Sequence, residues 1–229
     1  MRASFDAYWP HLLEVEGGYG DDRRDPGNWT GGKVGVGRLL GTKFGIAANT
    51  YPDEDIRNLT VERAKYLYLR DYMPKTGFDQ LPAGVDVVVG DYGINSGPSR
   101  ANKDLQRQVG APVDGRFGAK TLELARAQPP VKTIKGVSSH RLGFMQALRI
   151  WETYKGGWTK RVAKIEALSV KLWLAFDGLT PDEVSSRMEA EKREREKAAK
   201  KANDKAVGTG AGGAAGGAGT SQVPDVEGL

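Results

Sequence analysis

The sequence has no cysteine and only two histidines among its 229 residues. Without cysteine the chain has neither a disulfide framework nor a thiolate metal site. His11 and His140 lie far apart in the chain, so neither a histidine-rich metal centre nor a histidine-dependent catalytic triad is expected. We therefore predict an activity that needs no metal and no other cofactor.

Long apolar runs are also missing. No stretch approaches the roughly 18 apolar residues of a membrane-spanning helix. The first residues, 1–6, are not followed by the apolar core of a secretory signal. We expect a protein that is made in the cytoplasm without a signal peptide or membrane span. If it acts elsewhere, an export partner must release it.

The positive charge is small, and in the charged segment near residue 200 it does not form a stripe of one sign. The chain has a net charge of +5, and residues 187–205 hold eight basic and five acidic side chains, a net +3 (8 − 5). Because these charges alternate in sign, a nucleic-acid partner is not expected. The mild excess suits an anionic polymer, or it serves only solubility.

Helical periodicity dominates residues 1 to about 178. Phe5, Tyr8 and Leu12 recur at helical spacing, and Gly17 follows as a stop signal, although Pro10 conflicts with a straight helix. Glycine-rich residues 20–41 predict a loop or short hairpin. Further helices are predicted at 60–72, 85–94, 101–109, 119–127 and 138–154, followed by a core helix that ends near residue 176. Three tryptophans of this patterned sequence are expected in the core: Trp151, Trp158 and Trp173.

The composition changes near residue 180. Thr180-Pro181-Asp182-Glu183 offers a helix cap, a proline at the first helical position and a capping-box glutamate. The charged residues that follow predict a helix with hardly any apolar stripe. Residues 208–219, almost entirely Gly and Ala, predict a flexible linker.

Glu16 is the main candidate for chemistry. It continues the apolar stripe of the first predicted helix and lies at the negative end of the helix dipole. Burial and dipole both favour the protonated acid, which is the form that donates a proton to a glycosidic oxygen. The alternative is a helix-end glutamate paired with an arginine such as Arg23 or Arg24.

A glycosidase usually needs a second group, and Asp25 is the candidate. It lies nine residues after Glu16, and a short hairpin would bring it back towards that residue. Asp21 and Asp22 compete for the role. Asp25-Pro26-Gly27-Asn28 is also typical of an ordinary β-turn.

Several ordered motifs together resemble glycoside hydrolase family 108, bacterial and phage N-acetylmuramidases with a lysozyme-like fold. The resemblance covers roughly residues 4–176. It is carried by Glu16-Gly17-Gly18-Tyr19, Asp25-Pro26-Gly27, Thr42-Lys43-Phe44-Gly45-Ile46, the Gly90–Pro98 segment, and the Leu105–Leu122 region with its Val113-Asp114-Gly115 turn. The last of these resembles the family's predicted peptidoglycan-binding region, although scaffolding is the alternative role.

The resemblance implies a mostly α, lysozyme-like α+β fold with a small hairpin or loop region after the first helix. It implies that Glu16 is the acid, Asp25 the loop aspartate and Thr42 a hydroxyl that orients water. In the family the last two segments lie close together, whereas residues 28–41 separate them here. This insertion is either a longer hairpin that grips glycan or a tolerated surface feature. A water-positioning Asp25, which we favour, implies inversion, and a nucleophilic Asp25 implies retention.

Three further residues are candidates for binding substrate. Tyr19 and Tyr92 could each stack on a sugar ring, and core packing is the alternative for both. Asn95 could donate to an N-acetyl group, or it caps the end of its helix. Nearby Asp91 is either a partner of the site or a helix-face carboxylate.

The predicted organisation is a catalytic lobe at 1–100, a helical lobe at 101–178, a charged helix at 179–206 and a Gly/Ala-rich tail at 207–229. The predicted function is hydrolysis of the β-1,4 bond between N-acetylmuramic acid and N-acetylglucosamine, by an endolysin or a secretion-associated muramidase. The expected partners are peptidoglycan and an export partner such as a holin, with a monomeric enzyme acting in the periplasm. The alternatives are a lytic transglycosylase and a noncatalytic peptidoglycan-binding protein.

Overall fold

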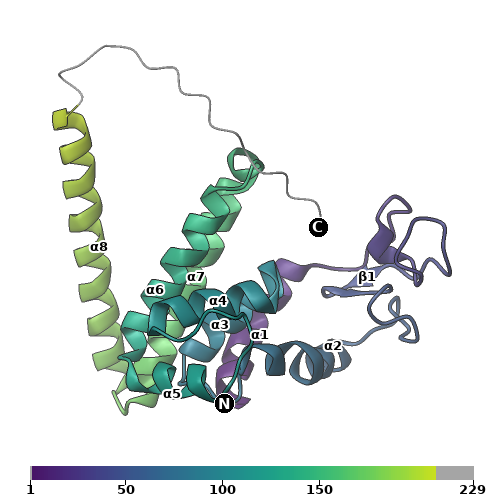
Figure 1. The fold of residues 1–229 in the computed structure, drawn as a ribbon, viewed down its shortest axis with the longest axis horizontal. Coiled ribbons are helices and arrows are strands. Elements are labelled where there is room, and N and C mark those ends of the chain that lie inside the picture. Colours follow the sequence, from purple (N-terminus) through teal and green to yellow (C-terminus); the bar gives the residue numbers. More distant parts are fainter. Residues whose placement is uncertain (1, 210–229) are drawn as a thin grey trace. The chain divides into compact units, whose positions relative to one another are not determined.

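A computed structural model describes residues 2–209 of the chain as a largely helical protein (Figure 1). Two compact units are present, and the first ends at Val184. The elements in chain order are α1 (Arg2–Glu16), a 3-10 turn (Pro26–Asn28), β1 (Thr42–Lys43), β2 (Ile46–Ala47), α2 (Val61–Leu67), a π-helical turn (Tyr68–Tyr72), a second 3-10 turn (Met73–Thr76), α3 (Val85–Ser96), α4 (Pro98–Val109), α5 (Ala119–Ala127), α6 (Pro130–Gln146), α7 (Trp151–Phe176) and α8 (Pro181–Thr209).

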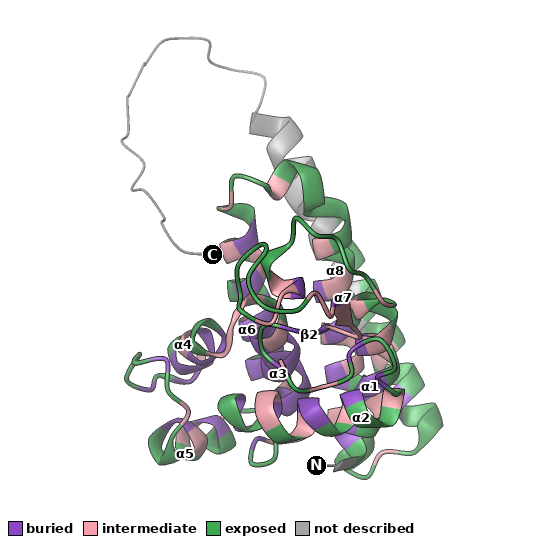
Figure 2. Cartoon of the chain, turned by 90° about the vertical axis from the view of Figure 1, so that its right-hand side faces the viewer, coloured by how far each residue is buried: buried purple, intermediate pink, exposed green. Residues whose placement is uncertain are grey.

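Helix α3 forms the centre of the first unit. Its residues from Val85 to Gly93 are all buried, and it packs against α1, α4, α6 and α7 (Figure 2). Glycine is needed at Gly90 because an added Cβ would lie 2.8 Å from the ring of Phe78. The predicted helix at 85–94 is confirmed, and it is buried from Val85 to Gly93 although its sequence contains Asp86 and Asp91.

Helix α1 is continuous through Pro10, whose side chain is exposed. Phe5, Tyr8 and Leu12 are buried, as the helical spacing predicted. The helix ends at Glu16, and Gly17 follows with a left-handed φ of 70°. Glu16 thus lies at the end of the buried stripe of α1, where the helix leaves the core.

The segment after α1 contains the predicted hairpin region. β1 and β2 pair antiparallel, with Thr42 opposite Ala47, and Gly20 bridges to Thr42 on the other side. The inserted segment folds back on itself through a bridge between Trp29 and Leu39, and residues 31–38 are exposed. The predicted mostly α fold with a small hairpin region after the first helix is therefore confirmed.

The predicted helix at 138–154 is wrong. The chain instead forms α6 and α7, joined by a turn in which the Leu148 and Trp151 amides donate to the carbonyls of Met145 and Leu148. This turn contains neither glycine nor proline, so the sequence lacks a stop signal there. The predicted core position of the three α7 tryptophans is also wrong, because each is only partly buried.

Helix α8 begins as the capping motif predicted. The Thr180 amide and hydroxyl donate to the Glu183 carboxylate at 2.8 and 2.7 Å. Val184, in the first turn of α8, is buried and closes the first unit. The predicted boundaries at residues 100, 178 and 206 stay predictions, and the predicted tail lies outside the described residues from 210 onwards. No helix within residues 2–209 is long and apolar enough to cross a membrane.

Candidate active site

Glu16 is the last residue of α1, and its side chain is 22% exposed. Burial is the largest effect on the pKa of its carboxyl and raises it. The positive charge of Arg161 lowers this pKa and the negative charge of Asp91 raises it, so that the pKa lies above its usual value. The cation of Arg161 lies 3.5 Å from the Glu16 carboxylate. Glu16 is thus a partly buried acid that remains open to solvent.

Arg161 connects Glu16 to a buried carboxylate on α3. Its guanidinium lies 2.9 Å from Asp91, closer than the 3.5 Å to Glu16. Asp91 also accepts hydrogen bonds from Arg141 at 2.6 Å and from the hydroxyl of Tyr8 at 2.8 Å. Because Arg161 is held mainly by Asp91, it neutralises Glu16 only in part, which agrees with the raised pKa.

Asp91 is ionised in this network although it is 1% exposed. Burial alone would raise its pKa, but Arg141 and Arg161 outweigh burial and hold the pKa below the usual value. Two arginines and a phenol satisfy the carboxylate of this ion cluster, whereas the Nε and Nη2 atoms of buried Arg141 have no hydrogen-bond partner among the described residues. The cluster ties α1, α3, α6 and α7 together next to Glu16, so the partner role for Asp91 is the one observed.

The β1–β2 turn closes on Glu16 from the other side. Phe44 and Gly45 both have positive φ, 50° and 73°, as a two-residue hairpin turn requires. A Cβ on Gly45 would lie 2.9 Å from the Glu16 Oε2 atom and 2.2 Å from the Tyr68 hydroxyl oxygen. The Tyr68 hydroxyl donates to the Phe44 carbonyl at 3.1 Å. Only glycine lets the turn approach the acid this closely.

A π-helical turn after α2 supplies tyrosines near Glu16. Tyr68 and Tyr72 lie in it with ring centroids 5.0 Å apart. The pKa of each is raised, first by burial, and the charge of Glu16 contributes in both cases. Such turns are frequent at functional sites because they reposition side chains within a helix. The tyrosines are neutral hydrogen-bonding groups around the acid.

The structure places Asp25 and Thr42 in the segment that follows α1. Asp25 is exposed, and its carboxylate accepts the Gly27 amide at 2.8 Å as the cap of a 3-10 turn. Thr42 lies in β1, two residues before the turn that faces Glu16, and its hydroxyl donates to Asn28 Oδ1 at 2.7 Å. Since the Thr42 proton is engaged by Asn28, its oxygen is left as an acceptor for water.

The three predicted substrate-binding residues differ in accessibility. Tyr19 is partly exposed, with Arg57 over its ring at 4.7 Å. Asn95 is exposed in the last turn of α3. Tyr92 is fully buried and donates to Asp104 at 2.7 Å. Its ring belongs to the core, so sugar stacking by Tyr92 is corrected to core packing.

Sequence reasoning missed Arg161, Tyr68 and Arg141. Each comes from an element far from Glu16 in the chain, and no local pattern marks it. The arginine partner of Glu16 is therefore Arg161, and not the nearby Arg23 or Arg24. Among the described residues, no group of three or more His, Asp or Glu is placed to hold a metal ion.

The class of protein defined by this fold and acid is a lysozyme-like glycoside hydrolase. The family described as Glycosyl hydrolase 108 matches residues 9–97, which include Glu16, the hairpin and α3. A solved structure, "Structure of Brucella abortus SagA", is 32% identical with a TM-score of 0.63, and the match covers 76% of this chain and 97% of that one. No curated protein matches the chain. The chain belongs to glycosyl hydrolase family 108, a membership that supports peptidoglycan as its substrate class.

Proposed function

We propose that this protein hydrolyses the β-1,4 bond between N-acetylmuramic acid and N-acetylglucosamine in peptidoglycan, with Glu16 as general acid. The observation that carries the proposal is the raised pKa of Glu16 at a solvent-open position beside the hairpin turn. A raised pKa increases the fraction of the carboxyl that holds a proton at a given pH, and the protonated carboxyl can protonate the leaving glycosidic oxygen.

Asp25 and Thr42 are proposed to position the attacking water. The oriented Thr42 hydroxyl would accept one hydrogen of that water, and the exposed Asp25 carboxylate would accept the other. Water delivered to the face of the sugar opposite Glu16 would invert the anomeric centre. An Asp25 that instead attacked the sugar directly would lead to retention.

The site of action follows from the substrate. A wall-cleaving enzyme must reach the periplasm, and we propose release through an export partner such as a holin, with the enzyme working as a monomer. Cell fractionation with and without the pore protein tests the release step, and sedimentation tests the monomer.

The test compares the wild type with Glu16→Gln on purified peptidoglycan, with the products analysed by mass spectrometry. Glu16→Gln should lower the rate roughly 100- to 10,000-fold because it removes the general acid. Hydrated, reducing muramic-acid ends from the wild type alone are the expected result. Glu14→Gln is the matched control, since Glu14 lies on the same helix and pairs with Lys164 at the surface.

Other outcomes would assign other functions. Anhydro-muramic ends would identify a lytic transglycosylase, in which the sugar closes an internal ring and no water is added. Absence of new ends from either protein on intact substrate would leave the noncatalytic binding protein as the better account. A Glu16→Gln variant as active as Glu14→Gln would remove Glu16 from the mechanism.

A further inference from the structure

The first turns of α7 carry an aromatic row that the protein's core does not use. Every residue from Trp151 to Arg161 is exposed or partly buried, and Tyr154 is 52% exposed. Tyr154 and Trp158 stack with centroids 5.5 Å apart and planes 21° apart, and Trp151 lies 6.2 Å from Trp158. Burying such rings in a core would stabilise the fold, so their exposure calls for another role.

This row is continuous with the candidate active site. Residues 151, 154, 158 and 161 are spaced by three and four, so they lie on one face of the helix. The last of them is Arg161, which contacts Glu16. At about 1.5 Å per residue the row extends roughly 15 Å from Arg161 to Trp151. It begins at the acid and leads away from it.

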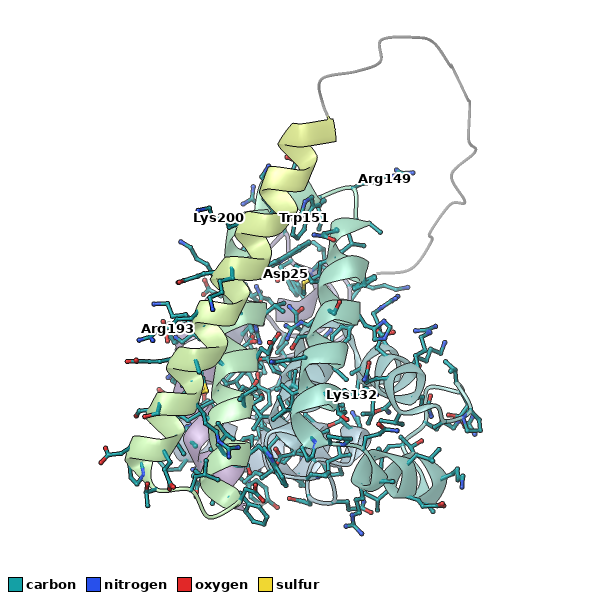
Figure 3. All side chains as sticks on the ribbon, turned by 90° about the vertical axis from the view of Figure 1, so that its left-hand side faces the viewer. Asp25, Lys132, Arg149, Trp151, Arg193 and Lys200 are labelled. Atoms are coloured by element: carbon teal, nitrogen blue, oxygen red, sulfur yellow. The ribbon has the colours of Figure 1, made fainter. Side chains whose placement is uncertain are left out.

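The row lies on a projecting part of the first unit. Figure 1 shows the joined end of α6 and α7 extending beyond the other helices of residues 1–184, and Figure 3 places Trp151 and Arg149 at that end. Residues 149–164 hold five basic side chains and one acidic. Three of the basic groups pair with carboxylates (Lys155 with Glu152, Arg161 with Asp91 and Lys164 with Glu14), so Arg149 and Lys160 supply the positive charge beside the row. Aromatic faces among positive charges match a polymer of sugar rings that bears carboxylates.

Two glycines beside the row lack a packing reason. Gly156 and Gly157 lie inside α7, where each costs about 1 kcal/mol of helix stability relative to alanine. A Cβ added to either would meet no atom of the described residues within 4 Å. The bare backbone next to Trp158 leaves room for a bulky group to approach the helix.

We infer that Trp151, Tyr154 and Trp158 form a binding platform for the glycan strand, on which sugar rings beyond the cleaved bond stack. The inference rests on the proposed function for the identity of the polymer. The platform would make the enzyme favour long glycan strands over short oligosaccharides, because only a long strand occupies both Glu16 and α7.

The test measures binding and cleavage separately. In the inactive Glu16→Gln protein, Tyr154→Ala with Trp158→Ala should weaken co-sedimentation with insoluble peptidoglycan about tenfold. In the active protein the same pair should lower kcat/KM on polymeric peptidoglycan about tenfold and leave cleavage of a short muropeptide tetrasaccharide unchanged. Phe176→Ala is the matched control, since Phe176 is a 72% exposed aromatic at the other end of α7.

Further variants and probes decide between occupants. Trp158→Phe should retain binding, because a stacking face remains, and thermal melts should show that all variants stay folded. Unchanged peptidoglycan binding by the double variant overturns the platform. If the wild type bound phosphatidylglycerol vesicles and the double variant did not, the row would be a lipid-binding surface and the platform would be overturned. If the wild type formed a dimer and the double variant did not, the row would bind a second copy of the chain, which would also overturn the platform.

Failure of the platform can be told from failure of the proposed function. A wild type that releases no new ends but binds peptidoglycan through the α7 aromatics would refute hydrolysis and keep the platform. A wild type that releases reducing ends, with a double variant equal to it on polymer, would refute the platform alone.

Discussion

The ionised form of the Glu16 carboxyl is less stable in the folded protein than in water. Burial is the largest cause of its raised pKa. A raised native pKa means that the folded protein binds this proton more tightly than the unfolded chain, so the contribution to stability falls as pH rises through the native pKa. If Glu16 is the proposed general acid, its position in the fold trades stability for function.

Glu16→Gln should therefore raise the melting temperature at pH 7 as it removes activity. The amide carries no charge to desolvate. The gain should vanish below about pH 4, where glutamate is protonated in both the folded and the unfolded chain. Thermal melts of both proteins from pH 3 to 8 check this, and a variant that is less stable than the wild type at pH 7 would contradict it.

We predict that Arg161 is a positioning residue whose charge sets the working pH range. Because Arg161 lowers the pKa of Glu16, Arg161→Gln should raise that pKa further and move the alkaline limb of the kcat–pH profile upwards. Arg161→Lys keeps the charge and should leave the limb nearly in place. A limb that does not move in Arg161→Gln would show that the arginine serves only the buried Asp91.

Asp86 makes an independent pH-dependent contribution to stability. It is fully buried at the start of α3, and burial raises its pKa to about 6. Its contribution is present below about pH 4 and is lost as pH rises through about 6. Asp86→Asn should be more stable than the wild type at pH 8 and no more stable at pH 4. Urea unfolding at both pH values checks the sign.

At the scale of elements, the β1–β2 turn is held against α1 by Gly45. Gly45→Ala should cost about 1 kcal/mol in left-handed strain, and its methyl group would also displace the Glu16 carboxylate and the Tyr68 hydroxyl. Activity should fall at least about tenfold, since small displacements of an acid are costly.

Gly35→Ala is the control for the turn. Gly35 has a similar φ of 78°, but an added Cβ there would meet no atom of the described residues within 4 Å. Gly35→Ala should lose a similar amount of stability to left-handed strain, but it should keep the activity of the wild type. Equal kcat values for Gly45→Ala and Gly35→Ala would contradict a role of the turn in placing Glu16.

At the scale of the whole molecule, the first unit should be sufficient for activity. The change in composition predicts that truncation after Asp177 leaves a folded, active enzyme. The structure adds that this cut removes buried Val184, worth about 2 kcal/mol. Truncation after Ala190 keeps it and should match the full chain in melting temperature and turbidity clearance. A folded but inactive product of that cut would show that the tail serves function.

The sequence by itself determined the helices whose signals are local. The stripe of Phe5, Tyr8 and Leu12 predicted α1 and placed Glu16 at its end, and Thr180 with Glu183 predicted the start of α8. The α6–α7 turn could not be predicted, because its sequence contains neither glycine nor proline. Backbone hydrogen bonds that become visible only in the structure hold this turn. Conversely, Gly156 and Gly157 look like a helix stop but lie within α7.

Only the tertiary structure decided what surrounds the acid. Arg161 reaches Glu16 across 145 residues and Asp91 across 70, and no local spacing encodes such contacts. Burial, which raises the pKa of Glu16 and takes Tyr92 into the core, depends on how α1, α3 and α7 pack together. The residue types of a chain specify which groups can act as acids, but their protonation and accessibility arise from neighbours that folding brings together.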